Sequence, residues 1–128
     1  MTPEVEEAVQ EIRRAFPDSA VTAAPDPQGG AYVTVDPVFI GQQWTPSETW
    51  IKFHMTFQYP YADCYPHFVT PDLRRADGGA PGEGMQVGIP SPDGHPATQL
   101  SRSSNRLDPV TDTALVKLIK VLEWLRSR

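Results

Sequence analysis

The chain has 128 residues and a mass of 14.2 kDa, and 39% of its residues are hydrophobic, which is enough for one packed core. Its formal charge of -5 and the absence of a basic cluster argue against a nucleic-acid partner. The single cysteine excludes an internal disulfide, a zinc ribbon and an iron–sulfur centre, and no apolar run reaches the length of a membrane span. We therefore expect one domain over residues 1–128 with no cofactor and no membrane association. Because its first residues lack a signal-peptide pattern, we expect it to be cytoplasmic.

A short amphipathic helix is predicted at about residues 3 to 16. Thr2 can cap it, Pro3 suits its first turn, and acidic residues follow where the helix dipole favours negative charge. Pro17 ends it. Its apolar residues recur at helical spacing: Val5, Ala8, Val9, Ile12 and Phe16. This helix needs a sheet or another helix to cover its apolar face.

Four strands are predicted next. Val21 to Ala23 and Tyr32 to Val35 flank a turn rich in proline and glycine and form an antiparallel hairpin. Pro37 indicates that the second of these strands lies at an edge or contains a bulge. Trp50 to Phe57 is the clearest strand, and a short strand at about His67 to Thr70 completes a meander. Alternation places four apolar side chains of the third strand on one face, Ile51, Phe53, Met55 and Phe57, and three polar ones on the other, Lys52, His54 and Thr56.

Residues 71–109 are rich in glycine and proline and show no helical or alternating pattern, which predicts a long irregular loop. The closing helix follows, with Asp108 as its cap and Pro109 in its first turn. It has an apolar stripe, Leu115, Leu118, Ile119, Leu122 and Leu125, and a solvent face, Lys117, Lys120, Glu123 and Arg126. The predicted fold class is therefore α+β: an N-terminal helix, a four-stranded antiparallel meander, a long irregular loop and a C-terminal helix packed on the sheet.

This order of elements resembles the fold of ubiquitin-conjugating enzymes and their RWD relatives. The segment from Phe53 to Thr70 is similar to the family's phenylalanine-rich strand, proline turn and Tyr-Pro pair, and Tyr65–Pro66 stands in the place of that pair. Further on, Gln99–Leu100 and Leu107–Asp108–Pro109 are similar to the family's Cys-Leu and to the Trp-Ser-Pro that opens a later helix. The resemblance covers nearly the whole chain and points to divergent prokaryotic members or to inactive variants.

The resemblance places Gln99 where the family carries its catalytic cysteine, and Ile89-Pro90-Ser91 where it carries His-Pro-Asn. An amide side chain cannot take an acyl group from a thioester as a thiolate does. The resemblance therefore implies a catalytically inactive protein that binds a protein partner in a prokaryotic ubiquitin-like modification or defence pathway. That partner would be a ubiquitin-like protein, an activating enzyme or an active conjugating enzyme.

A rival hypothesis is an enzyme that uses another nucleophile. Cys64 is the one thiol, and His67 lies close to it in the sequence, so Cys64, His67 and the loop residue His95 are the candidates for catalysis. A buried, inert cysteine is the commoner state. His54 and His67 could be cross-strand neighbours, but no pair of histidines has a metal-ligand spacing, so no metal site is predicted.

A third hypothesis is a small anion-binding domain. Arg102, Asn105 and Arg106 lie in the polar stretch before the closing helix, where arginine forks and a helix amino terminus both favour carboxylates or phosphates. Together with Gln99, they are the residues that we expect to contact a ligand or partner. Trp44 joins them, as part of a protein-binding patch, if its ring is exposed.

Overall fold

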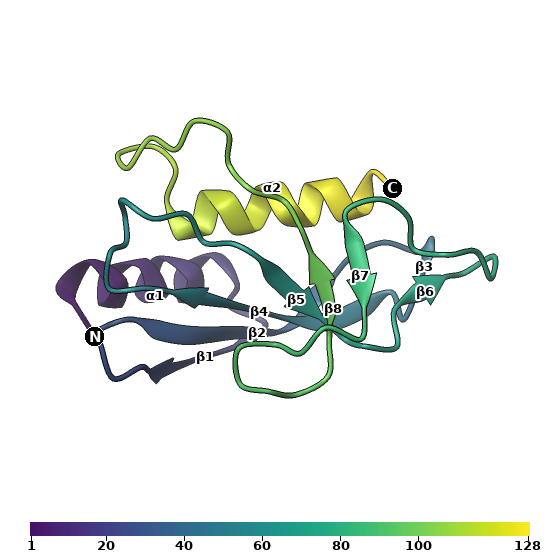
Figure 1. The fold of residues 1–128 in the computed structure, drawn as a ribbon, viewed down its shortest axis with the longest axis horizontal. Helices are drawn as coiled ribbons and strands as arrows, with labels where there is room; N and C mark the ends of the chain where they lie inside the picture. The colour runs from purple at the N-terminus through teal and green to yellow at the C-terminus, as the bar shows by residue number, and fades with distance from the viewer.

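Two helices cover one face of an antiparallel sheet in the computed structural model, which describes all 128 residues (Figure 1). The helices are α1 (Pro3–Ala15) and α2 (Ala114–Arg126), and they pack against each other. The strands are β1 (Ala20–Pro25), β2 (Ala31–Phe39), β3 (Trp44–Thr45), β4 (Glu48–Met55), β5 (His67–Val69), β6 (Arg74–Arg75), β7 (Met85–Val87) and β8 (Thr98–Leu100). The main sheet has the order β1-β2-β4-β5-β8-β7, and β3 pairs with β6 apart from it. The predicted α+β class is confirmed.

The local signals of the sequence explain α1. Thr2 is the cap, and its Oγ1 accepts a hydrogen bond from the Val5 N–H at 3.2 Å. At the other end, the Phe16 N–H donates to the Ile12 carbonyl at 3.0 Å. The buried residues are four of the five in the predicted apolar face: Val5, Ala8, Val9 and Ile12. The fifth, Phe16, follows the last residue of the helix and is partly buried against the core. The amphipathic helix is thus confirmed, and its glutamates remain on the outer side.

The sheet begins with the predicted meander, but the predicted count of four strands is wrong. β1, β2, β4 and β5 pair in chain order, and a register shift between Val35 and Val38 confirms the bulge at Pro37. β8 then pairs with β5, and β7 pairs with β8, which makes six strands. Residues 71–109 therefore supply β6, β7 and β8 to the fold. Each of these is two or three residues long, too short for an alternating pattern to show in the sequence.

The two faces of β4 follow the predicted alternation up to the end of the strand. Its core residues are Ile51, Phe53 and Met55. The prediction that Phe57 joins them is wrong, because β4 ends at Met55 and Phe57 is 49% exposed. His67 of β5 pairs with Phe53 and shares its buried face, whereas His54 points to the opposite face. The prediction that His54 and His67 are cross-strand neighbours is therefore also wrong.

α2 begins at Ala114, later than the predicted start at Pro109. Its cap is Thr113, whose Oγ1 accepts a hydrogen bond from the Val116 N–H at 3.2 Å. The Ala114 N–H, which has no partner inside the helix, donates to the Tyr59 hydroxyl at 3.1 Å. This bond comes from a distant segment of the chain, so the local sequence pattern could not place the start of the helix.

Asp108, the predicted cap, holds a separate turn before α2. Its Oδ1 accepts a hydrogen bond from the Val110 N–H at 2.9 Å, and its carbonyl accepts one from the Asp112 N–H at 2.7 Å. The side chain of Asp112 in turn accepts from the Asp108 N–H at 2.7 Å. The prediction that Asp108 caps the helix is wrong because this closed turn uses its side chain.

The buried face of α2 is rotated relative to the predicted stripe. Its buried residues are Ala114, Lys117, Leu118, Val121, Leu122, Trp124 and Leu125. Lys117, which the pattern places on the solvent face, is only 7% exposed, and Ile119, which it places in the stripe, is 38% exposed. A buried ammonium group is tolerated when it is paired, and Lys117 is bonded to Asp63 and Ser104.

One cluster of 25 buried residues joins α1, the sheet and α2. Trp44 of β3 belongs to this cluster, and its Nε1 donates to the Leu125 carbonyl at 2.9 Å. The bond ties the small β3–β6 sheet to the carboxyl end of α2. Figure 1 shows β3 and β6 at the end of the molecule toward which the carboxyl end of α2 points. Neither helix combines the length and the apolar character that a bilayer span requires.

Candidate functional site

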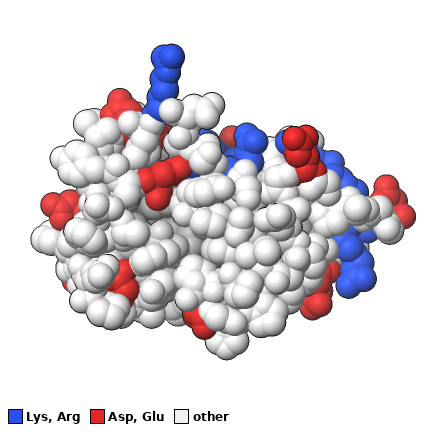
Figure 2. Space-filling view, viewed as in Figure 1, with Lys and Arg blue, Asp and Glu red and all other residues white.

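A polar hollow, which we call the basic hollow, lies between the segment 102–106 and α2. Its volume is about 290 Å³, and it is lined by Arg102, Ser103, Ser104, Asn105, Arg106, Asp112, Lys117, Lys120 and Val121. Four of these residues are basic, although the whole chain has a formal charge of -5. Figure 2 shows basic side chains along the upper edge of the molecule and at its right-hand end. In Figure 1, the upper edge is the part of the molecule that α2 and the segment before it occupy. The hollow therefore collects positive charge on an acidic protein.

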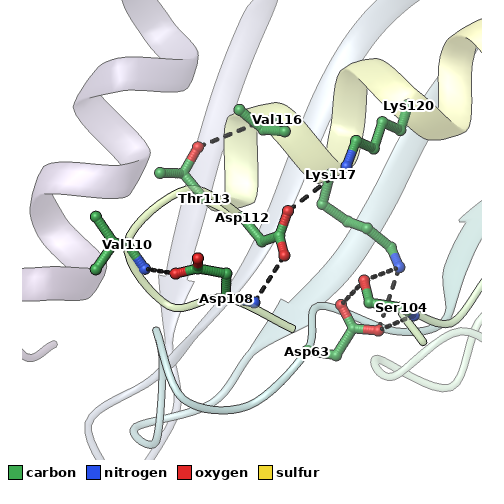
Figure 3. Close-up of polar contacts among 9 residues, drawn as sticks. All are labelled: Asp63, Ser104, Asp108, Val110, Asp112, Thr113, Val116, Lys117 and Lys120. Atoms are coloured by element: carbon green, nitrogen blue, oxygen red, sulfur yellow. Dashed lines mark hydrogen bonds and ion pairs between the residues drawn. The ribbon is translucent and has the colours of Figure 1, made fainter. Parts of the chain in front are cut away.

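Asp63 anchors the segment before α2 to the rest of the protein (Figure 3). Its carboxylate accepts hydrogen bonds from the Ser104 N–H at 2.7 Å, the Ser104 Oγ at 3.1 Å and the Lys117 ammonium at 3.2 Å. Lys117 also donates to the Ser104 Oγ at 3.0 Å. Burial alone raises the pKa of Asp63, but these bonds outweigh it and hold the pKa below its usual value. Three segments of the chain thus meet in one closed network beside the hollow.

The basic hollow has more hydrogen-bond donors than internal acceptors. Neither Arg102 nor Arg106 forms an ion pair, and the side-chain amide of Asn105 has no hydrogen bond within the protein. Asp112 is the only acidic residue in the lining, and its Oδ1 lies 3.5 Å from the Lys120 ammonium. Such a surplus of donors is suited to an acceptor-rich ligand with negative charge.

The structure brings together three of the residues predicted to bind a ligand or partner: Arg102, Asn105 and Arg106 all line the basic hollow. Trp44 is 2% exposed. A protein-binding patch at Trp44 was predicted only if its ring were exposed, so this buried residue does not form one. The segment before α2 could be chosen from the sequence because its arginines and polar residues precede an amphipathic helix. The contributions of Asp63 and Lys117 were missed because they depend on contacts between distant segments.

Gln99 lies apart from the basic hollow. It is in β8, half-buried, between Phe68 of β5 and Gln86 of β7, and its Nε2 donates to the Ser101 Oγ at 3.1 Å. The next residue, Leu100, belongs to the core that the helices cover, so Gln99 faces the other side of the sheet. The position that the resemblance assigns to the catalytic residue is therefore not beside the start of α2.

Cys64 and His67 do not form a nucleophile and base. Cys64 is 4% exposed, and burial, followed by the charge of Asp63, raises the pKa of its thiol to about 12. His67 is fully buried against Phe53, and neither of its ring nitrogens has a hydrogen-bond partner. Burial, followed by the charge of Lys117, lowers the pKa of His67 to about 3. At neutral pH both groups are uncharged, whereas a nucleophilic pair needs a hydrogen bond between them and a thiolate.

The other two histidines lie at separate positions. His54 Nε2 is 2.6 Å from the Asp26 carboxylate, and its ring stacks on Tyr32 at a centroid distance of 4.4 Å. The side chain of His95, a candidate for catalysis, is 74% exposed, and its Nδ1 lies 3.2 Å from the Asp93 carboxylate. No group of three or more His, Cys, Asp or Glu side chains is placed to hold a metal ion.

A second hollow lies between α1, the loop 56–66 and the turn before α2. It is lined by Pro3, Glu4, Glu7, Ala8, Glu11, Tyr59, Pro60 and Pro109. None of the three glutamates belongs to an ion pair. In the same loop, Phe57 is 49% exposed, Tyr61 is 78% exposed and Tyr65 is 43% exposed. From this loop the hollow is lined by Tyr59 and Pro60, and the three exposed rings lie at other positions of the same loop. We use the name acidic–aromatic surface for the three glutamates together with these exposed aromatic residues of the adjoining loop. The spacing of the glutamates is visible in the sequence, but their position beside the loop is not.

No family model matches the sequence, and no curated protein or solved structure is significantly similar to it. The fold and the sites define an α+β domain with two distinct surface features. One is the basic hollow beside α2, and the other is the acidic–aromatic surface beside α1.

Proposed function

We propose that this protein is a ubiquitin-conjugating-like domain without transfer activity, which binds a protein partner in a prokaryotic ubiquitin-like modification or defence pathway. The order α1, the antiparallel run β1-β2-β4-β5 and α2 supports the family part, as does Tyr65–Pro66 immediately before β5. The partner is a ubiquitin-like protein, an activating enzyme or an active conjugating enzyme. The acidic–aromatic surface is the observation that carries the docking part.

The state of the only thiol supports the absence of transfer activity. Accepting an acyl group from a thioester requires a thiolate that the donor can reach. Cys64 meets neither requirement, because it is 4% exposed and the pKa of its thiol is about 12. The resemblance in sequence aligns Gln99 with the family's cysteine, and an amide offers no comparable nucleophile, although β8 sets Gln99 on the face of the sheet away from the helices. These properties favour a docking protein over an enzyme that uses Cys64.

The acidic–aromatic surface has the composition of a binding surface. Exposed aromatic rings bury a large apolar area on contact and are enriched among the residues that contribute most to protein binding. The neighbouring glutamates have no internal ion pair, so their charge is free to attract a partner. The partner therefore presents lysine or arginine side chains to α1 and an apolar pocket to Tyr61.

Calorimetric titration of the purified protein with each of the three candidate partners tests the docking. We expect Tyr61→Ala and the double substitution Glu4→Gln with Glu7→Gln to weaken binding by about tenfold each, and added salt to weaken it further. The double substitution Glu48→Gln with Glu83→Gln removes two exposed carboxylates outside α1 and serves as the matched control for the glutamate pair. Binding to none of the three partners, or an equal loss with the control, contradicts the proposal.

A transfer assay tests the absence of activity. The protein is incubated with ATP, an activating enzyme and a ubiquitin-like protein, and the products are separated without reducing agent. We expect no thioester adduct between the protein and the ubiquitin-like protein, that is, no adduct that a thiol reagent cleaves. An adduct that disappears in Cys64→Ser supports the rival enzyme, and an adduct that survives this substitution shows transfer at another residue, so either one contradicts the proposal.

A further inference from the structure

Two positive charges in the basic hollow are not neutralised by the protein. Each lysine in the lining faces a carboxylate, with Lys117 at 3.2 Å from Asp63 and Lys120 at 3.5 Å from Asp112. Arg102 and Arg106, by contrast, face no carboxylate within ion-pair distance. The two unpaired arginines therefore leave the hollow with two positive charges, which a doubly negative ligand would balance.

The free donors are of the kind that bind phosphate oxygens. The guanidinium groups of Arg102 and Arg106 each present several N–H groups in a planar fork, which matches the geometry of phosphate. The Asn105 amide adds two more N–H groups. The Lys117 ammonium has three N–H groups, of which two are engaged within the protein. Donors of this number are better matched by the oxygens of phosphate than by the two oxygens of a carboxylate.

The side chains of Arg102, Asn105 and Arg106 are exposed, but one of these donors and the backbone beside another are held in place. The bond from the Ser104 N–H to Asp63 fixes the backbone next to Asn105. The guanidinium of Arg102 lies over the Trp124 ring, 5.0 Å from its centroid, where a cation–π contact restrains it. Donors that are positioned before binding reduce the entropy lost when the ligand binds. The hollow is in this respect prepared at Arg102 and Lys117.

We infer that the basic hollow binds a phosphate group, either as inorganic phosphate or as a small phosphomonoester. Its volume of about 290 Å³ lies at the lower limit of small-molecule pockets, roughly 300 to 1,000 Å³, which favours a small group over a whole nucleotide. Because the hollow and the acidic–aromatic surface have different linings, phosphate binding does not depend on the proposed protein partner.

Calorimetric titration of the whole chain at low salt tests the inference, with inorganic phosphate and phosphoserine as probes and acetate as a singly charged comparison. We expect one saturable site for at least one phosphate probe. Arg102→Gln and Arg106→Gln each remove charged donors and weaken binding by about tenfold. Arg14→Gln removes an equal charge from the exposed side of α1 and leaves the affinity within about twofold.

Amide NMR spectra of the unaltered protein give a second readout that does not rely on variants. Phosphate is expected to shift the resonances of Ser103 to Arg106, Lys117 and Lys120, and to leave those of α1 unchanged. The inference is overturned if neither phosphate probe saturates, if acetate binds as tightly as phosphate, if Arg14→Gln weakens binding as much as Arg106→Gln, or if the shifts lie outside the hollow.

Discussion

Replacing Asp63 by alanine removes the only carboxylate that is paired with the buried ammonium of Lys117. The side chains of Lys117 and Asp63 are 8% and 20% exposed, so the pair is largely shielded from water. Removing one partner of a buried ion pair costs about 3 to 5 kcal/mol, and the partial exposure of Asp63 places this case near 3 kcal/mol. The Ser104 N–H loses its acceptor as well. For a domain of this size, such a loss lowers the melting temperature by roughly 10 °C.

Urea denaturation at pH 7 measures this cost, and a double-mutant cycle assigns it to the pair. In the variant that combines Asp63→Ala with Lys117→Met, no buried charge is left, so we expect much of the lost stability to return, with a coupling energy of about 2 kcal/mol. A coupling below about 0.5 kcal/mol would refute the reasoning, because the two side chains would then act independently.

The pH dependence of the stability that Asp63 contributes gives a second test, because the direction of the change follows from the lowered pKa. Because the pKa of Asp63 is lowered from its usual 3.8, the unfolded carboxylate takes up a proton before the folded one as the pH falls. The contribution of Asp63 is therefore complete well above pH 4 and is lost as the pH falls through the lowered pKa. The difference in stability between the native protein and Asp63→Ala should shrink over that range.

Three further predictions concern Cys64, His67 and Thr113. Because the pKa of Cys64 is raised from 9.0 to about 12, alkylation by iodoacetamide at pH 8 should be at least about a hundredfold slower in the folded than in the urea-unfolded protein; similar rates by intact-mass spectrometry would show an accessible thiolate. His67, with its pKa lowered from 6.5 to about 3, takes up a proton more readily when unfolded, so stability should fall by about 2 kcal/mol between pH 7 and pH 5. His67→Phe should remove most of that fall in urea titrations at the two pH values, and an unchanged fall would assign it to other groups. Thr113→Ala should cost about 1 kcal/mol in the same assay, through loss of the cap of α2, and an unchanged stability would contradict the assignment of this cap.

The elements that the sequence predicted well are those whose signals lie close together in the chain. The cap of α1 at Thr2 and its apolar face are adjacent or a few residues apart, so near neighbours specify the helix. The strand around Phe53 alternates over enough residues to be recognised, and Pro37 marks the bulge of β2 because proline cannot donate a hydrogen bond to a ladder. The predicted meander matches β1, β2, β4 and β5, which pair in chain order.

Most of the errors fall where a distant contact decides the local structure. β7 and β8 consist of three residues each and exist because β5 offers a free edge for pairing. α2 starts at Ala114 because Tyr59 and Thr113 together satisfy its first N–H groups. The hydrophobic pattern of α2 places Lys117 on the solvent face. Lys117 is buried instead, because its ammonium group forms an ion pair with Asp63.

The residues of the candidate site also divide into those that the local sequence identified and those that only the fold places. Arg102, Asn105 and Arg106 were identified from their position before an amphipathic helix, and they do line one hollow. Gln99 was grouped with them by a resemblance in sequence, yet it faces the other side of the sheet. The exposure of Tyr61 followed from no local pattern.

What the sequence determined by itself is the pair of amphipathic helices, the antiparallel meander and the polar composition of the segment before α2, because hydrophobic periodicity and capping act between residues a few positions apart. Only the tertiary structure decided that Lys117 and His67 are buried, that Asp63 joins three segments beside the basic hollow, and that the thiol of Cys64 is shielded. Burial, and the electrostatics that depend on it, are properties of contacts between distant parts of the chain.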